Sequence, residues 1–71
     1  MNREQLIAAR ICLDVSHDKN SFRANTEITM KVWESMVAEG WACRGESKDT
    51  FCIYHLTDEG IVELGFRMDH Q

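Results

Sequence analysis

The sequence has no proline, only 4 glycines among its 71 residues, and no internal repeat or low-complexity segment. Without a linker-like composition anywhere, we expect one compact domain over residues 1–71. Long apolar runs are also missing, because no stretch approaches the roughly 20 apolar residues of a membrane-spanning helix. The start of the chain lacks a basic region followed by an apolar core, which argues against a secretory signal. We therefore expect a soluble, cytoplasmic protein.

The motifs of common enzymes are absent as well. The sequence has no glycine-rich phosphate loop, no Gly-x-Ser-x-Gly and no His-Glu-x-x-His. Cys52 and His55 share one predicted strand, and alternation along a strand places them on opposite faces. A chain this short has little room for a concave pocket. We therefore expect a protein that is not an enzyme, with no catalytic residue and no cofactor.

Cysteines are few and widely spaced. Cys12, Cys43 and Cys52 make an odd number without a Cys-x-x-Cys pair, which favours buried thiols in a reducing compartment over disulfides. The alternative is a zinc site with ligands from the predicted hairpin and flanking segments: Cys43, Cys52, His55 and either His17 or His70. Because ligand pairs at tight spacing are missing, we expect no metal.

The chain has no excess of basic charge. Its formal net charge is −4, and residues 57–71 account for −3, with four acidic residues and one arginine. Residues 16–56 hold five basic and six acidic residues. This balance argues against strong nonspecific DNA binding, which needs a basic stripe. A local patch forms only if folding gathers the basic residues of that half: Lys19, Arg23, Lys31, Arg44 and Lys48.

An N-terminal helix is predicted from a variant capping box of Asn2 and Gln5 to about Val15. Its apolar residues cover a broad arc that needs cover on more than one side: Leu6, Ile7, Ala9, Ile11 and Leu13. The polar segment Ser16–Arg23 is interpreted as a loop or single turn, with Phe22 as its one residue able to dock on the core.

A second helix is predicted over residues 26–39, capped by Asn25 or Thr26. Its buried stripe has helical spacing and comprises Val32, Trp33, Met36 and Val37. Gly40 should end this helix, because glycine adopts the left-handed conformation without steric cost, and Trp41 should pack back on Met36.

A β-hairpin is predicted from two short runs rich in aromatic and branched residues, 41–44 and 51–56, around the polar tip 45–49. Symmetric pairing places Cys43 opposite Cys52. The inward face is then Trp41, Cys43, Cys52, Tyr54 and Leu56. The outer face carries Ala42, Arg44, Phe51, Ile53 and His55, and is unusually apolar for a solvent surface.

Thr57 is predicted to cap a closing helix with Asp58 and Glu59 in its first turn, where the helix dipole favours negative charge. Its expected buried stripe is Ile61 and Leu64, with Val62 and Phe66 as further members. The predicted core joins all three helices and the hairpin, with Trp41 as its anchor: Leu6, Trp33, Met36, Trp41, Tyr54, Leu56 and Leu64.

The order of these motifs resembles one family of folds. Residues 36–44, Met-Val-Ala-Glu-Gly-Trp-Ala-Cys-Arg, then a gap of nine residues, then 54–60, Tyr-His-Leu-Thr-Asp-Glu-Gly, are similar to part of bacterial winged-helix proteins. The MarR-like and PadR-like regulators have a recognition helix, a wing and a closing helix in this order. The match covers little more than half of the chain. It implies an α+β winged-helix-like domain with the order helix, helix, β-hairpin, helix.

The resemblance also implies a DNA-binding surface. It would place Ile28, Met30 and Lys31 on the groove-facing side of the second helix and Ser47 on the wing. The residues we expect to contact double-stranded DNA are Arg23, Met30, Lys31, Arg44 and Lys48. The alternative is a protein-interaction module, such as a phage- or plasmid-encoded adaptor or inhibitor, that binds a protein through the outer hairpin residues Phe51 and Ile53.

Chain length bears on self-association. A domain of this size buries only roughly 60% of its unfolded surface, so its single core is marginal and dimerisation is a common remedy. The first helix and the outer hairpin face are the candidate surfaces of a homodimer. The alternative is that these two surfaces cover each other within one monomer.

Overall fold

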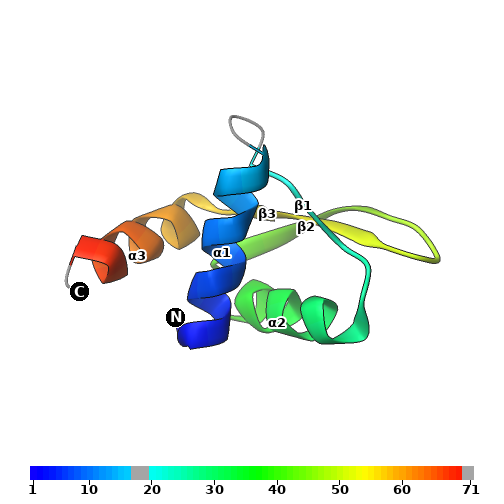
Figure 1. Ribbon diagram of the computed structural model, residues 1–71, viewed down its shortest axis with the longest axis horizontal. Helices are drawn as coiled ribbons and strands as arrows, with labels where there is room; N and C mark the ends of the chain where they lie inside the picture. The colour runs from blue at the N-terminus through cyan, green and yellow to red at the C-terminus, as the bar shows by residue number, and fades with distance from the viewer. Residues whose placement is uncertain (17–19, 70–71) are drawn as a thin grey trace.

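The computed structural model describes the backbone of residues 1–16 and 20–69 and the side chains of residues 1–14 and 20–65. Its elements, in chain order, are α1 (Arg3–Ser16), β1 (Phe22–Ala24), α2 (Glu27–Ala38), β2 (Ala42–Ser47), β3 (Cys52–Leu56) and α3 (Asp58–Asp69) (Figure 1). The predicted α+β domain with two helices, a hairpin and a closing helix is therefore confirmed. None of the described helices has the length and apolar character needed to cross a membrane.

The sheet contains a third strand, β1, beside the two strands of the hairpin. The sheet is antiparallel with the order β1-β3-β2, and β1 pairs Phe22 with Tyr54 and Ala24 with Cys52. The prediction of a loop across Ser16–Arg23 is wrong for Ser16, which ends α1, and for Phe22 and Arg23 of β1. Residues 17–19 lie outside the described part. A polar segment forms a strand here because β3 offers an open edge whose backbone groups need partners.

The hairpin register differs from the prediction. Cys43 pairs with His55 and Ser47 pairs with Cys52, with an irregularity between Arg44 and Ser47. The turn is closed by a hydrogen bond of 2.8 Å from the Lys48 amide to the Phe51 carbonyl. The predicted pairing of Cys43 with Cys52 is wrong, because much of the expected tip belongs to β2. A register shift by an odd number of residues moves a side chain to the other face, so Cys43 is exposed.

Trp33 lies at the centre of the core, with its side chain completely buried. Its ring stacks on Phe22 at 5.4 Å and on Tyr54 at 5.5 Å between centroids. Trp41, predicted to be the anchor, is only half-buried at the edge of the core. The other buried apolar residues come from both sheet and helices: Met1, Ala8, Ala9, Cys12, Ala24, Met36, Ala42, Cys52, Tyr54, Leu56 and Leu64.

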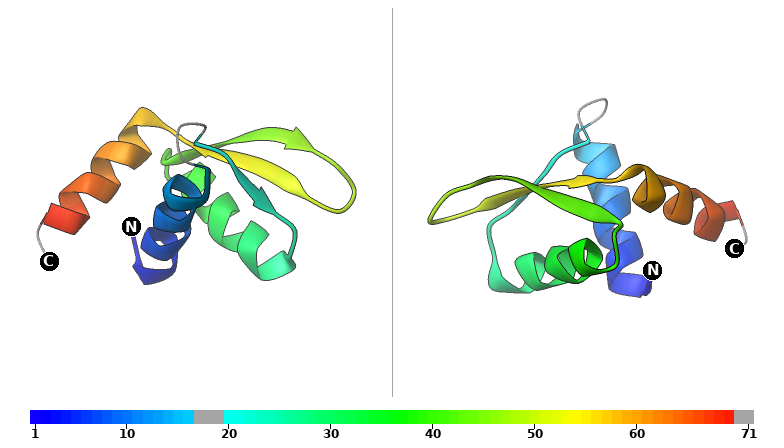
Figure 2. Two further views of the ribbon diagram at one scale, coloured as in Figure 1. Left: turned by 45° about the horizontal axis from the view of Figure 1, so that its top comes forward. Right: turned by 180° about the vertical axis from the view of Figure 1, so that it is seen from behind.

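Two predicted apolar faces are only partly covered. On α1, Ala8, Ala9 and Cys12 are buried, whereas Ile7 is 50% and Ile11 is 43% exposed. On α3, Leu64 is buried, but the expected stripe is otherwise wrong: Ile61 is 41% and Val62 is 70% exposed, and the side chain of Phe66 lies outside the described residues. The cause is the position of α3, which extends away from the sheet and is covered by α1 on one side only (Figure 2).

The predicted helix ends are confirmed. Asn2 and Gln5 form the reciprocal capping box, with distances of 2.8 and 2.9 Å between amide nitrogens and side-chain oxygens. Thr26 accepts a hydrogen bond from the Thr29 amide at the start of α2. At its end Gly40 has a φ of 84°, and the Trp41 amide donates to the Met36 carbonyl at 2.9 Å. These bonds form a Schellman motif, which turns the chain sharply into β2.

Candidate functional site

The helix α2 presents part of the surface expected to contact DNA. Lys31 is exposed on it, and Met30 is half-buried against the core. Ile28 is 78% exposed, which makes the start of α2 more apolar than a phosphate-binding helix requires. On this helix, Lys31 is therefore the one residue among those we assigned to DNA that is both basic and exposed.

Arg44 is engaged by the protein itself. Its guanidinium forms a two-point ion pair with Glu34 of α2, and the Tyr54 hydroxyl donates to the same carboxylate at 2.7 Å. Hydrogen bonds from Arg44 and then Tyr54 lower the pKa of Glu34, and the bond to Glu34 raises the pKa of Arg44. Burial, followed by the bond to Glu34, raises the pKa of Tyr54. This network ties β2 and β3 to α2 and leaves Arg44 less available to phosphate.

Lys48 and Arg23 also contact other side chains of the protein. On the exposed hairpin tip, the Lys48 Nζ atom lies 3.2 Å from Oε1 of Glu46. The Arg23 guanidinium lies over the Phe51 ring, 4.5 Å from its centroid. Lys19 lies outside the described residues. Arg23, Arg44 and Lys48 are thus each engaged by another side chain of the protein.

The outer hairpin face is less open than the sequence suggested. Phe51 and Ile53 are half-buried, and Arg23 covers Phe51. On the neighbouring β2 strand the outer face carries Cys43, not Ala42 and Arg44 as predicted. Phe51 and Ile53 remain candidate contacts, but they do not form a large bare apolar surface.

The cysteines lie apart. Cys12 and Cys52 are buried as predicted, whereas Cys43 is exposed, which corrects its assignment as a buried thiol. Cys43 and Cys52 occupy opposite faces of the sheet, so they do not join as zinc ligands. Among the described residues no group of histidine, cysteine and acidic side chains is placed to hold a metal ion. His17 and His70, which completed the zinc alternative, lie outside that part of the chain.

A groove lies where α3 meets the turn after α2. The Thr57 amide donates to the Trp41 carbonyl at 3.0 Å, and the Thr57 hydroxyl donates to the Gly40 carbonyl at 2.7 Å. The same hydroxyl caps α3 by accepting from the Gly60 amide at 3.0 Å. Gly60 packs directly on the Trp41 backbone, since a Cβ there would lie 2.0 Å from the Trp41 carbonyl oxygen. Thr57 and Gly60 therefore hold the first turn of α3 against Trp41.

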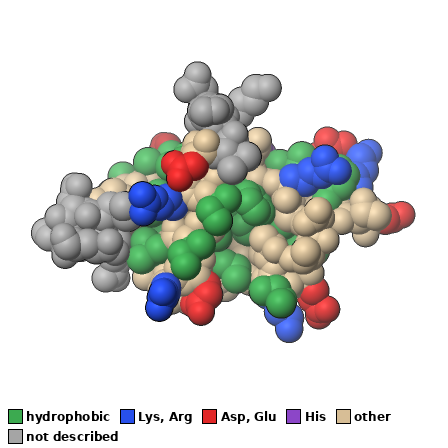
Figure 3. All heavy atoms as spheres, in the orientation of Figure 1, with side chains coloured by type: hydrophobic (Ala, Val, Ile, Leu, Met, Phe, Trp, Pro, Cys, Tyr) green, Lys and Arg blue, Asp and Glu red, His purple; other side chains and the backbone are tan. Residues whose placement is uncertain are grey.

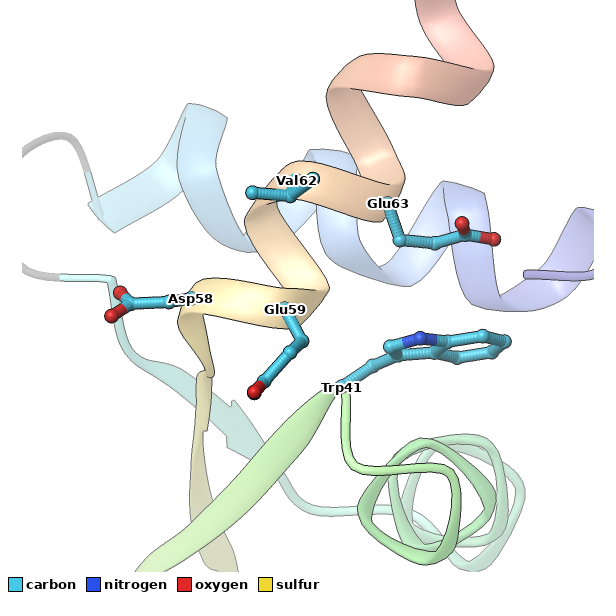
Figure 4. Close-up of a pocket in the computed structure, with 5 residues that line it drawn as sticks. All are labelled: Trp41, Asp58, Glu59, Val62 and Glu63. Atoms are coloured by element: carbon cyan, nitrogen blue, oxygen red, sulfur yellow. The ribbon is translucent and has the colours of Figure 1, made fainter.

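This contact forms the α3–Trp41 groove, an open cavity of about 570 Å³ lined by Trp41, Asp58, Glu59, Val62 and Glu63. Figure 4 shows the Trp41 ring and the Glu63 carboxylate extending to the same side, while Asp58 points the other way. The α-amino group of Met1 forms an ion pair with Glu63. None of the described lining residues is basic. The groove surface is therefore mainly apolar, with Trp41 and Val62 in its lining, and the Glu59 and Glu63 carboxylates border it.

Sequence reasoning did not find this groove. It assigned Trp41 to the core and explained Asp58 and Glu59 by the helix dipole alone. The sequence feature that could have indicated the groove is Val62, an apolar residue flanked along one helix by acidic residues. This feature indicates a groove only when the position of Trp41 beside α3 is known.

A second exposed apolar surface lies on α1. Figure 3 shows hydrophobic side chains gathered over the centre of the molecule, where α1 faces the viewer. Ile7 and Ile11 contribute to the exposed apolar surface of this helix. This surface is one of the two predicted candidates for a homodimer contact, the other being the outer hairpin face, and the homodimer stays a prediction.

The order of elements is compatible with a winged-helix-like shape, with two helices before the hairpin and one after it. Membership of the MarR-like or PadR-like regulators stays a prediction. Comparisons with protein-family models, with curated proteins and with solved structures each found no match.

Proposed function

We propose that this protein is a non-enzymatic interaction module that binds a partner protein through the α3–Trp41 groove. The observation that carries the proposal is the groove itself, in which Val62 is 70% exposed beside a half-buried tryptophan. Exposed apolar side chains around an aromatic residue, bordered by polar groups, are typical of protein contacts. The described lining residues include no histidine, cysteine, serine or lysine, so we favour binding over catalysis.

The charges support a protein partner over DNA. Arg44 is paired with Glu34, Lys48 with Glu46, and Arg23 is stacked on Phe51. A DNA contact would have to compete with these interactions, in a chain of net charge −4. The exposed thiol of Cys43 fits a reducing compartment, and we propose that the protein is cytoplasmic.

The test uses a matched pair of lysine substitutions. Val62→Lys places a charge in the groove, and Ile28→Lys makes the same change on α2, at a side chain that is 78% exposed. Tagged wild type and both variants are used to capture partners from a lysate of the cells that make the protein. We expect one discrete protein with the wild type and Ile28→Lys but not with Val62→Lys. Equal capture by Val62→Lys, or no specific capture by the wild type, contradicts the proposal.

DNA binding through α2 and the hairpin is the second candidate. It is favoured by the contact between Glu34 and Arg44, which holds the hairpin against α2, the helix that carries exposed Lys31. The test is fluorescence anisotropy with random duplex DNA at low salt. A helix-and-wing binder must show affinity that falls with salt and is lost in a Lys31→Glu/Lys48→Glu variant, which leaves the Arg44 network intact. Absence of salt-dependent binding excludes this candidate.

A further inference from the structure

The charged side chains that line the α3–Trp41 groove are all acidic. Asp58, Glu59 and Glu63 all come from α3, and Glu59 and Glu63 are one helical turn apart, where like charges repel. The helix dipole favours Asp58 and Glu59 in the first turn, but Glu63 lies beyond its reach. Glu63 is instead satisfied by a cation, the α-amino group of Met1. Among the described side chains, Asp58 and Glu59 have no such ion pair.

The Trp41 ring supplies a second means of binding a cation. Indole is the aromatic ring on which an ammonium or guanidinium group stacks most favourably. Trp41 is half-buried and lines the groove, so part of its ring is available. The same kind of contact occurs elsewhere in this chain, where Arg23 lies over Phe51.

Val62 adds an apolar requirement. A hydrophilic cation alone would leave the exposed methyl groups of Val62 in water. An entirely apolar segment would cover the Glu59 carboxylate without pairing its charge, which is costly. An acidic segment would be repelled by the carboxylates of α3. The occupant that satisfies Trp41, Val62 and Glu59 together is both basic and apolar.

Building on the proposed function, we infer that the partner docks a segment combining arginine or lysine with apolar side chains. One basic side chain of the partner stacks on Trp41, and a second pairs with Glu59, because the Glu59 carboxylate points away from the Trp41 ring (Figure 4). An apolar side chain of the partner covers Val62. Each of these contacts is small, so the affinity of an isolated segment depends on making them together.

The probes are two short capped peptides, one alternating arginine with leucine and the other alternating glutamine with leucine. The readout is the pair of tryptophan indole N–H signals in the NMR spectrum of ¹⁵N-labelled protein, assigned with a Trp41→Phe variant. Trp33 is completely buried and is the internal reference. We expect the arginine peptide to shift the Trp41 signal and leave the Trp33 signal in place, with an affinity that falls as salt is added. The glutamine peptide should cause little shift.

Two variants locate the contact. Val62→Lys should abolish the shift, while Ile28→Lys should retain it, since both change exposed positions but only Val62 lines the groove. Glu59→Gln should weaken binding by about two- to fivefold, the effect of removing one exposed ion pair. A Glu46→Gln variant, on the hairpin tip, should bind as the wild type does.

The outcomes separate this inference from the proposed function. Equal binding of both peptides, or affinity unchanged in Glu59→Gln, overturns the basic segment and leaves the groove as a protein contact. No shift of Trp41 with the arginine peptide also overturns the inference, while the proposed function still stands if Val62→Lys loses the captured partner. Capture that survives Val62→Lys overturns the function on which the inference rests.

Discussion

The side-chain amide of Asn20 pairs with the backbone of Leu56 as a neighbouring strand would. Its Nδ2 donates to the Leu56 carbonyl at 2.8 Å, and its Oδ1 accepts from the Leu56 amide at 3.0 Å. The Asn20 carbonyl accepts from Nδ1 of His55 at 2.9 Å. Asn20 has a φ of 47°, a left-handed conformation that asparagine tolerates better than most residues. One side chain therefore extends the pairing of β1 with β3 beyond Phe22.

Asn20→Ala should destabilise the domain by about 2–3 kcal/mol, because both backbone groups of Leu56 lose their partner. Urea denaturation followed by circular dichroism measures the change. Asn25→Ala, at an exposed position before α2, is the control and should stay within about 0.5 kcal/mol of the wild type. Equal stability of the two variants would show that the Asn20 bonds contribute nothing.

Two glycines of α3 should respond in opposite directions to alanine. Gly60→Ala forces a Cβ to 2.0 Å from the Trp41 carbonyl oxygen and should cost about 1–3 kcal/mol. Among the described residues, a Cβ at Gly65 meets nothing within 4 Å, so Gly65→Ala should stabilise the helix by about 0.5–1 kcal/mol. Melting temperatures of both variants test this. A Gly60→Ala protein as stable as Gly65→Ala would contradict the tight contact between α3 and Trp41.

The two tryptophans should differ in their importance for stability. Trp33→Ala empties the centre of the core and should cost about 3–5 kcal/mol, a large share of the stability of so small a domain. Trp41→Ala removes a half-buried ring and should cost less. Chemical denaturation of both variants decides the order. A larger loss for Trp41→Ala would restore Trp41 as the anchor that the sequence suggested.

Thiol reactivity should distinguish Cys43 from the other cysteines. In the native protein a colorimetric thiol reagent should modify one thiol quickly, because Cys43 is exposed while Cys12 and Cys52 are buried. Denaturant should make all three react. Cys43→Ser should remove the fast phase, and a fast phase that persists in this variant would show that the hairpin register is different.

Acid should weaken the Glu34 network. The pKa of Glu34 is held below its ordinary 4.5 in the folded protein, first by the hydrogen bond from Arg44 and then by that from Tyr54. Its stabilising effect is thus present above the unfolded-state pKa and lost as pH falls through the lower folded-state pKa. Because the side chain is 39% exposed, Glu34→Gln should cost only about 0.5–1 kcal/mol at neutral pH.

The measurement for Glu34 is the free energy of unfolding as a function of pH. As the pH falls below about 5, the free energy of unfolding of Glu34→Gln should decrease less steeply than that of the wild type. Glu46→Gln, which alters an exposed carboxylate on the hairpin tip, is the control. Parallel curves for the wild type and Glu34→Gln would mean that the ion pair with Arg44 is not populated in solution.

The features that depend on near neighbours in the chain could be predicted from the sequence. The Asn2–Gln5 capping box, the caps at Thr26 and Thr57 and the turn at Gly40 were all predicted and are confirmed. Each is formed by backbone and side-chain groups within a few residues, so the local sequence contains both partners. The helices, the hairpin and the α+β class follow from these signals and from the spacing of apolar residues.

Which faces are buried and which segments meet follows from the three-dimensional fold and could not be predicted from the sequence. The strand β1 forms because β3 offers an open edge. The irregularity in β2 sets the register that exposes Cys43. Trp33, not Trp41, is the tryptophan that is completely buried. The groove arises where Gly60 packs on Trp41, residues far apart in the chain. Burial and strand pairing depend on residues far away in the chain, and a local sequence pattern does not predict which residues those are.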